Sequence, residues 1–129
     1  MLFRSPHLSI VIDHAAKPAI ASGEIAPWLA DLGVLAALPN VHCKLSGLLT
    51  EAGPFPQGQR VQPYMEAVYR LFGPNRLIWG SDWPVLRLAD SYEAWLAMAM
   101  HFCEAQAGAT DDTLAAIFGG NARRFYRLD

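Results

Sequence analysis

The sequence predicts an α/β fold in which three parallel strands alternate with helices, and two observations support this prediction. Three short apolar runs of strand length are bounded by Pro, Asn or Gly, at residues 8–13 (LSIVID), 41–46 (VHCKLS) and 76–82 (RLIWGSD). The segments between them repeat apolar residues at spacings of three and four, as in a helix with one buried face. Such alternation favours a parallel sheet, because parallel neighbours need a long right-handed crossover connection.

The first two helices and the connecting loop follow from the same patterns. The run at 8–13 is predicted to be a strand buried on both faces, because its centre is continuously apolar. Residues 50–62 (TEAGPFPQGQRVQ) are rich in Pro and Gly, and we expect an irregular loop there, on the functional side of a β/α protein. The apolar helix faces before and after this loop are Ile25, Trp28, Leu29, Leu32 and Leu35, and Met65, Val68, Tyr69 and Phe72.

Further helices are predicted after the third strand. Asp90 is expected to cap the first of them, with Glu93 at the capping-box position. A shorter helix is predicted to start after Thr110 and to end at the glycine pair 119–120. Asn121 is then expected to cap a final turn.

The composition gives no indication of nucleic-acid binding, membrane insertion or secretion. The formal net charge is -2 and no run of like charge stands out, so nucleic acid is not an expected partner. No apolar stretch approaches the roughly 18 residues needed to cross a bilayer, and no signal-peptide cleavage pattern is seen, so a cytoplasmic protein is expected. Cys43 and Cys103 have neither metal-site nor disulfide spacing and are expected to be reduced core residues.

Polar residues stand at the end of each predicted strand, where a buried run has no need of them: His14, Lys44 and Asp82. Because the carboxyl ends of parallel strands meet at one edge, we expect these side chains to lie close together. Each has a structural alternative. Asp82 could be a turn residue ahead of Pro84, His14 a hydrogen-bonded loop residue, and Lys44 an ion-pair partner of Asp13 or Asp82.

A carboxylate, an imidazole and an ammonium at one edge suit the hydrolysis of a carbonyl compound. Asp82 would accept a proton from water as general base, while His14 or Lys44 would stabilise the oxygen that becomes negative. Alternatively, His14 and Asp82 would bind a divalent metal, although two ligands are too few to hold it tightly. The remaining histidines are expected to be surface or packing residues: His7, His42 and His101.

Four segments, in this order, resemble the amidohydrolase-related family, in the branch with fuconolactonase and pyrone-dicarboxylate lactonase: IVIDHAAKP, PNVHCKLSGLLTE, FGPNRLIWGSDWPV and IFGGNARRFYRL. The most specific signal is WGSDWP followed about forty residues later by N-A-x-x-F-Y. The resemblance covers nearly the whole chain. It implies the C-terminal part of a (β/α)8 TIM-type barrel, with about three parallel strands, their helices and closing C-terminal helices.

The resemblance also implies residue roles. Asp82 matches the general base for water at the end of the last strand, and His14 matches a histidine that binds the substrate carbonyl; in metal-using relatives both are metal ligands. The segment at 44–47 matches a strand that lines the pocket, so Lys44 is expected to contact the substrate, with Trp83 in the wall and Glu51 as a loop contact. The implied cofactor is one divalent ion, zinc or manganese, or none in metal-free branches. The implied substrate is a small lactone or ester, such as a sugar lactone.

The sequence departs from the family pattern because the H-x-H pair of the family's first strand is absent. Its 129 residues are also about half of the roughly 250 that a closed barrel needs. Residues 1–129 are therefore expected to form a single partial domain, inactive alone, that self-associates or requires a missing N-terminal half, because strand edges and an inner face stay uncovered. The alternatives are a non-catalytic half-barrel that binds a partner chain, and a flavodoxin-like sheet, which would lack its phosphate loop.

Overall fold

Three parallel strands form the sheet. The structure, a computed structural model, describes residues 7–54 and 56–129. Within these residues, β1 (Ile10–Ile12), β2 (Val41–Leu45) and β3 (Leu77–Trp79) are ordered β1-β2-β3, and both strand pairs are parallel. The carboxyl ends of the strands therefore lie at one edge of the sheet. The predicted strand order and direction are confirmed, although each strand is shorter than its apolar run.

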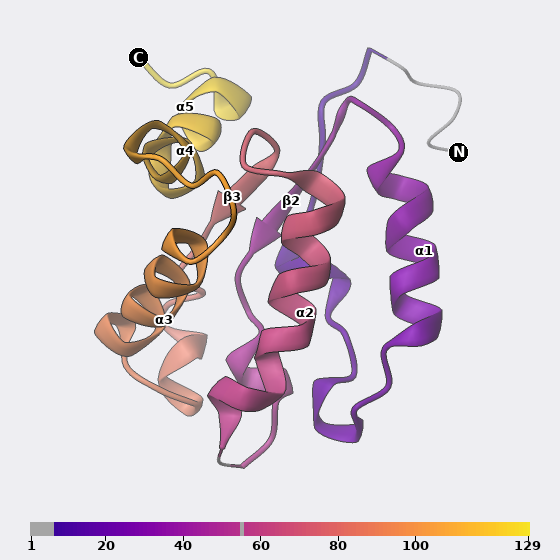
Figure 1. Cartoon of the computed structure of the whole chain (residues 1–129), viewed down its shortest axis with the longest axis vertical. Helices are drawn as coiled ribbons and strands as arrows, with labels where there is room; N and C mark the ends of the chain where they lie inside the picture. The colour runs from indigo at the N-terminus through magenta and orange to yellow at the C-terminus, as the bar shows by residue number, and fades with distance from the viewer. Residues whose placement is uncertain (1–6, 55) are drawn as a thin grey trace.

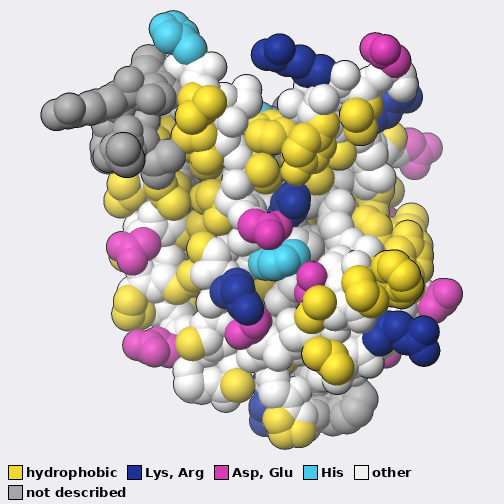
Figure 2. Space-filling model, turned by 180° about the vertical axis from the view of Figure 1, so that it is seen from behind, with side chains coloured by type: hydrophobic (Ala, Val, Ile, Leu, Met, Phe, Trp, Pro, Cys, Tyr) yellow, Lys and Arg dark blue, Asp and Glu magenta, His cyan; other side chains and the backbone are white. Residues whose placement is uncertain are grey.

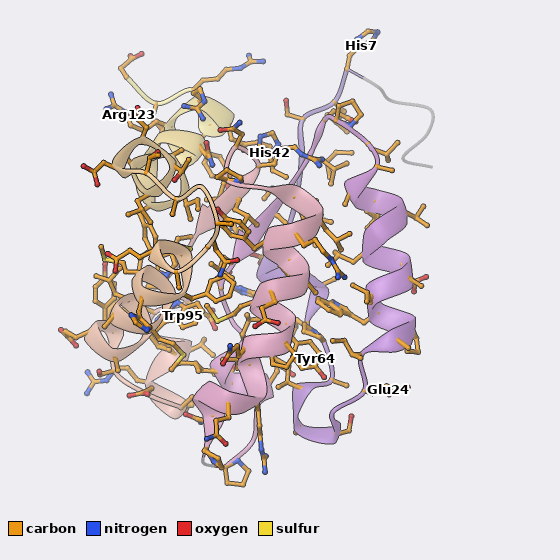
Figure 3. All side chains as sticks on the ribbon, viewed as in Figure 1. His7, Glu24, His42, Tyr64, Trp95 and Arg123 are labelled. Carbon is orange, nitrogen blue, oxygen red and sulfur yellow. The ribbon has the colours of Figure 1, made fainter. Side chains whose placement is uncertain are left out.

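Helices cover one face of this sheet. In Figure 1, α2 (Gln57–Phe72) lies in front of the strands, with α1 (Ala26–Ala36) to one side and α3 (Tyr92–Glu104) to the other. Trp95 of α3 is 1% exposed and its Nε1 donates a hydrogen bond to the Gly80 carbonyl at 2.9 Å (Figure 3). This bond ties α3 to the chain that leaves β3. Among the described helices, none is long and apolar enough to span a membrane.

The side chains of β2 alternate between the core and the opposite face. Val41, Cys43 and Leu45 are fully buried, whereas His42 and Lys44 between them are partly exposed. Successive side chains of a strand point to opposite faces of a sheet. His42 and Lys44 therefore point away from the buried core, and polar chemistry is carried on the face that α1 and α2 do not cover.

Both cysteines are buried free thiols, as predicted. Cys43 and Cys103 are 0% and 1% exposed. Burial raises the pKa of each thiol to about 12. The thiolate, which is the reactive form, is therefore disfavoured at neutral pH, and both residues act as apolar packing groups.

β1 is not buried on both faces, and that prediction was wrong. Ile10, Val11 and Ile12 are each only partly buried. Among the described strands β1 lies at the edge of the sheet, with β2 as its one neighbour. A continuously apolar strand that is half exposed is suited to contact with another apolar surface.

The loop predicted for residues 50–62 is shorter than expected, because α2 already begins at Gln57. The buried face of α2 includes Val61 and Tyr64, which precede the predicted apolar stripe. The Tyr64 hydroxyl donates a hydrogen bond to the Glu24 carbonyl at 3.0 Å, and Figure 3 shows the two residues close together. Burial of this stripe outweighs the poor helix propensity of Pro63, which lies inside the helix.

The cap of α3 is displaced by one residue from its predicted position. Ser91, not Asp90, is the N-cap, and its hydroxyl accepts a hydrogen bond from the Ala94 N–H at 3.1 Å. Asp90 instead accepts one from the Ser91 N–H at 2.7 Å. Glu93 therefore does not occupy the capping-box position. Ser91 has the extended backbone that an N-cap requires, which explains the shift.

The C-terminal helices are interrupted at the predicted glycine pair. Thr110 caps α4 (Asp111–Ala115), as expected. A π turn at Ala116–Gly120 follows, in which Gly119 departs from helical geometry (φ 178°, ψ -48°), so the chain kinks at the predicted glycine pair before α5 (Asn121–Tyr126) begins. Gly120 lies at the N-cap of α5, and Asn121 is its first residue rather than its cap.

Asn121 has another structural task. Its side chain is 1% exposed, and Nδ2 donates hydrogen bonds to the carbonyls of Pro74 and Leu77 at 2.6 and 2.7 Å. These bonds satisfy backbone acceptors beside β3 and fix α5 against that strand. A buried amide with this role explains why the residue is not available as a cap.

Candidate active site

His14 is placed at the carboxyl end of β1 by an unusual backbone. It lies in a tight turn, η2 (Asp13–Ala16), and the φ angles of His14, Ala15, Ala16 and Lys17 are 46°, 49°, 60° and 50°. Each non-glycine residue in this left-handed region costs about 1–2 kcal/mol. Tertiary contacts offset this cost: Ala15 is fully buried and its carbonyl accepts a hydrogen bond from Trp28 Nε1 at 2.7 Å.

Replacing Ala16 by Gly is therefore expected to stabilise the chain by about 0.5–1 kcal/mol. Ala16 is exposed, so the substitution removes the left-handed strain without opening a cavity, although glycine loses more backbone entropy on folding. Urea unfolding of the chain measures the difference. The matched control is Ala30→Gly on the exposed face of α1, where the same change should destabilise by about 1 kcal/mol. Destabilisation by both variants would contradict the strain argument.

His14 and Asp82 meet at the predicted edge. The distance from His14 Nε2 to Asp82 Oδ1 is 3.3 Å, and their side chains are 28% and 13% exposed. The other ring nitrogen, Nδ1, lies 2.8 Å from the Ser46 hydroxyl at the end of β2. Residues from the ends of all three strands thus converge on one imidazole. The expectation that His14 and Asp82 share one rim is confirmed.

Asp82 is both a turn residue and a member of this cluster. Its φ is 57°, and its carbonyl accepts a hydrogen bond from the Leu86 N–H at 2.8 Å. This bond starts the turn that leads into η5 (Val85–Leu88). Asp82 can therefore be a turn residue and a member of the site at the same time, because the turn directs its carboxylate toward His14.

Lys44 is paired with Asp13 rather than with Asp82. The Lys44 Nζ to Asp13 Oδ1 distance is 3.2 Å, and Asp13 Oδ2 lies 3.5 Å from His14 Nε2. Burial of Lys44 by itself lowers its pKa, but its interactions with Asp13 and Tyr126 outweigh that effect and the pKa is raised. The amine therefore carries a positive charge at neutral pH, and it shares the Asp13 carboxylate with the imidazole.

The predicted substrate contacts Glu51 and Trp83 lie on the segments that follow β2 and β3. Glu51 forms an ion pair with Lys17 at 3.1 Å, so the loop after β2 is joined to the left-handed turn. Trp83 follows Asp82 directly, and 63% of the residue is exposed. Val85 and Leu88, on the same short segment, are 50% and 86% exposed. The segment after Asp82 therefore presents apolar side chains beside the polar cluster.

The cluster lies on the open face of the molecule. Figure 2 shows the side opposite to that in Figure 1, where acidic, basic and histidine side chains gather near the centre with apolar side chains around them. Carboxylates, ammonium groups and one imidazole thus share a surface that helices α1 and α2 leave uncovered. Such a grouping can accept, donate and hold protons near a bound molecule.

Sequence reasoning placed two further residues on a pocket-lining segment but gave them no role of their own. Ser46 is 1% exposed and contacts the His14 ring through its hydroxyl. Gly47 has a φ of 64°, and a Cβ atom built there would lie 2.6 Å from His14 Cγ. The ring therefore packs directly on the Gly47 backbone. Both residues are small and neutral, and the pattern of apolar runs gives no signal for them.

The other histidines are not part of the site, as predicted. His7 and His101 are exposed. His42 packs edge-on against Phe125 of α5, with ring centroids 5.0 Å apart. Burial lowers the pKa of His42, as do the nearby charges of Arg76 and Arg124. His42 is therefore a neutral packing residue at pH 7.

Among residues 7–54 and 56–129, no group of three or more His, Cys, Asp or Glu side chains is arranged to hold a metal ion. The two candidate ligands, His14 and Asp82, nevertheless have a suitable separation. Tetrahedral zinc with bonds of about 2.0–2.2 Å places neighbouring ligand atoms about 3.3–3.6 Å apart, and the observed separation is 3.3 Å. The pair fits two positions of such an ion.

Comparison with known proteins places this geometry in context. Residues 2–128 match the sequence profile of the family described as Amidohydrolase. The chain is 58% identical over 129 residues to L-fucono-1,5-lactonase of Burkholderia ambifaria, an alignment that covers 98% of this chain and 44% of that protein. It is 42% identical over 130 residues to L-fucono-1,5-lactonase of Burkholderia multivorans, covering 92% of this chain and 43% of the relative.

A solved structure of the same family superimposes on this chain. An amidohydrolase from Burkholderia multivorans, crystallised with bound zinc, superimposes with a TM-score of 0.91 at 39% sequence identity. The superposition covers 98% of this chain and 46% of that structure. The chain thus spans less than half the length of the proteins it matches. The resemblance inferred from the motifs and the fold class, part of a (β/α)8 barrel, are both confirmed.

Proposed function

Because this chain belongs to the amidohydrolase family, we propose that it forms part of a hydrolase that opens the ring of a small lactone with an activated water molecule. The observation that carries this proposal is the 3.3 Å contact between His14 Nε2 and Asp82 Oδ1 at the carboxyl ends of the strands. Two of the relatives that it matches are L-fucono-1,5-lactonases, so a sugar lactone is the proposed substrate class.

In the proposed reaction, Asp82 accepts a proton from water as the water oxygen attacks the lactone carbonyl carbon. The negative charge that develops on the carbonyl oxygen is stabilised by a donor such as the Nε2–H group of His14. The bond between the carbonyl carbon and the ring oxygen then breaks, and a proton passes from Asp82 to that oxygen. The product is an open hydroxy acid, and Asp82 returns to its ionised form.

The remaining predicted contacts complete the proposed pocket. Lys44 carries a positive charge beside His14, which favours a substrate oxygen that is or becomes negative. Glu51 is proposed to bind sugar hydroxyl groups from the loop after β2, and Trp83 to form an apolar wall. Both side chains are close in sequence to strand ends, from which loops of β/α barrels contact their ligands.

A divalent metal fits this proposal. The structure of the Burkholderia multivorans relative contains zinc, and the separation of His14 Nε2 and Asp82 Oδ1 suits two ligands of one ion. We propose that in a metal-bound form these two residues would hold it, with further ligands from residues that this chain does not contribute. Nε2 would then carry no proton, and the ion would replace the Nε2–H group as the partner of the carbonyl oxygen. A bound divalent ion lowers the pKa of water toward neutrality, so it would ease the proton transfer to Asp82.

The chain alone is proposed to be inactive. It matches only 44% of its Burkholderia ambifaria relative, and its site faces an open surface rather than an enclosed pocket (Figure 2). Enzymes of this kind depend on excluding water and on several loops at the barrel mouth. The unmatched segment of the relative would supply the missing walls and ligands.

The test is complementation. The segment of the Burkholderia ambifaria lactonase that this chain does not match would be fused to this chain in the relative's order, and we call the product the fusion protein. It is expected to hydrolyse L-fucono-1,5-lactone, with and without added zinc or manganese, whereas the chain alone is not. A cooperatively folded fusion protein that hydrolyses no sugar lactone would overturn the proposal.

The alternative function is a non-catalytic half-barrel that binds a partner chain. The exposed side chains of Trp83, Val85 and Leu88 favour a contact surface at this position. This alternative predicts that the chain binds the unmatched segment of the relative but that the complex lacks turnover. The same complementation experiment therefore separates the two functions.

A further inference from the structure

Ser46 lies where its hydroxyl can fix the orientation of the His14 ring. It follows β2 directly, is 1% exposed, and its hydroxyl oxygen lies 2.8 Å from His14 Nδ1. On its other side, a Cβ at Gly80 would lie 3.2 Å from Ser46 Cβ. The glycine after β3 thus leaves room for the serine. Ser46 therefore links the ends of β1, β2 and β3 in a dry environment where a hydroxyl needs a partner.

Gly47 completes a seat for the same ring. A Cβ there would approach His14 Cγ, Nδ1 and Cβ to 2.6, 2.7 and 2.8 Å. No other residue could occupy the position without moving the imidazole. The ring is therefore fixed by packing on one side and by the Ser46 hydroxyl at its Nδ1 edge.

The surroundings of Nε2 decide which ring nitrogen carries the proton. Nε2 lies 3.3 Å from Asp82 Oδ1 and 3.5 Å from Asp13 Oδ2. Ionised carboxylates only accept hydrogen bonds, whereas a serine hydroxyl can donate or accept. A neutral imidazole beside two carboxylates is therefore most stable with its proton on Nε2. Nδ1 then carries a lone pair, which only a donor can satisfy.

We propose that Ser46 is a positioning residue that donates a hydrogen bond to His14 Nδ1 and so holds the imidazole with its Nε2–H group directed at Asp82. The arrangement of the ring follows from the contacts of this chain alone. Its catalytic consequence rests on the proposed function, because the Nε2–H group is the donor assigned there to the developing oxyanion. Ser46 itself would touch neither substrate nor water.

Nitrogen-15 NMR of the isolated chain tests the arrangement directly. In metal-free buffer at pH 8.5, a two-bond proton–nitrogen spectrum distinguishes protonated from unprotonated ring nitrogens. The His14 signals are assigned with a His14→Gln variant. We expect an unprotonated Nδ1 and a protonated Nε2. A proton on Nδ1, or two tautomers in comparable amounts, would overturn the proposal.

Variants of Ser46 then test its role. In Ser46→Ala, the Nδ1 resonance is expected to move toward that of an imidazole nitrogen without a hydrogen bond, and the nuclear Overhauser effect between the His14 ring and the Gly47 α protons to fall by at least half. The matched control is Ser81→Ala, which removes a hydroxyl next to Asp82 that bonds the Trp83 N–H instead. It should change neither signal. Unchanged signals in Ser46→Ala would contradict the proposed role of Ser46.

A second variant covers the case in which Ser46→Ala does not fold. Ser46→Cys keeps an atom of similar size at the buried position but offers only a weak donor. The Nδ1 resonance should move in the same direction by a smaller amount, and an unmoved resonance would also count against the proposal. None of these readouts needs turnover. An inactive fusion protein with the expected tautomer in the chain would refute the proposed function and leave the positioning role of Ser46 intact.

Discussion

Replacing Asp82 by Asn in the fusion protein is expected to lower kcat for lactone hydrolysis by about 10²–10⁴-fold, the range that a positioned general base contributes. Asparagine has nearly the same shape as aspartate, so the turn that begins with the Asp82 carbonyl should persist. Its amide cannot accept a proton from water near neutral pH. The loss should therefore appear in kcat with little change in KM, because the substrate does not need the carboxylate in order to bind.

The control for this prediction is Asp90→Asn. Asp90 also lies after β3, but its carboxylate accepts a hydrogen bond from the Ser91 N–H at the start of α3. Steady-state kinetics should show an effect of less than about threefold for this variant, consistent with a residue outside the reacting site. A kcat for Asp82→Asn within tenfold of the unmodified fusion protein would show that another group activates water.

Replacing Gly47 by Ala is expected to destabilise the chain by about 2–5 kcal/mol. A left-handed φ costs a non-glycine residue about 1–2 kcal/mol, and forcing an extra methyl group into a packed site typically costs about 1–3 kcal/mol more. The new Cβ would overlap the His14 ring, whose atoms lie 2.6–2.8 Å from its ideal position. His14 must then move away from Ser46 and Asp82. Urea unfolding followed by circular dichroism measures the loss.

Gly108→Ala separates the two causes. Gly108 has a φ of 77°, and a Cβ there would meet nothing within 4 Å. This variant should therefore show only the backbone cost, about 1–2 kcal/mol. Equal destabilisation by Gly47→Ala and Gly108→Ala would mean that the His14 ring yields without cost, and that Gly47 does not help to fix it.

Much of the fold was accessible from the sequence because burial leaves a periodic signal. The three apolar runs and the spacings between them predicted parallel strands crossed by helices. Boundaries were less accessible where tertiary contacts decide them. α2 starts early because Tyr64 and its neighbours are buried, and Asn121 leaves the cap of α5 because its amide binds carbonyls beside β3.

The candidate site was predictable for a similar reason and only in part. His14 and Asp82 stand out because a charged or polar residue directly after an apolar run is costly unless it has a function or a partner. Ser46 and Gly47 have no such contrast, and their role depends on the position of a ring from another strand end. The left-handed run from His14 to Lys17 was also hidden, because alanine and lysine carry no preference for positive φ.

The chemistry assigned to the strand ends requires that His14 and Asp82 act on the same reacting bond. A double-mutant cycle in the fusion protein tests this most directly, with kcat/KM measured for His14→Gln, Asp82→Asn and the combination of both. The effects of groups that act as a unit are strongly non-additive. The kcat/KM of the double variant is therefore expected to be within about tenfold of that of the less active single variant. A double variant whose loss equals the product of the two single losses would show that the two residues work independently, contrary to the site described by the structure.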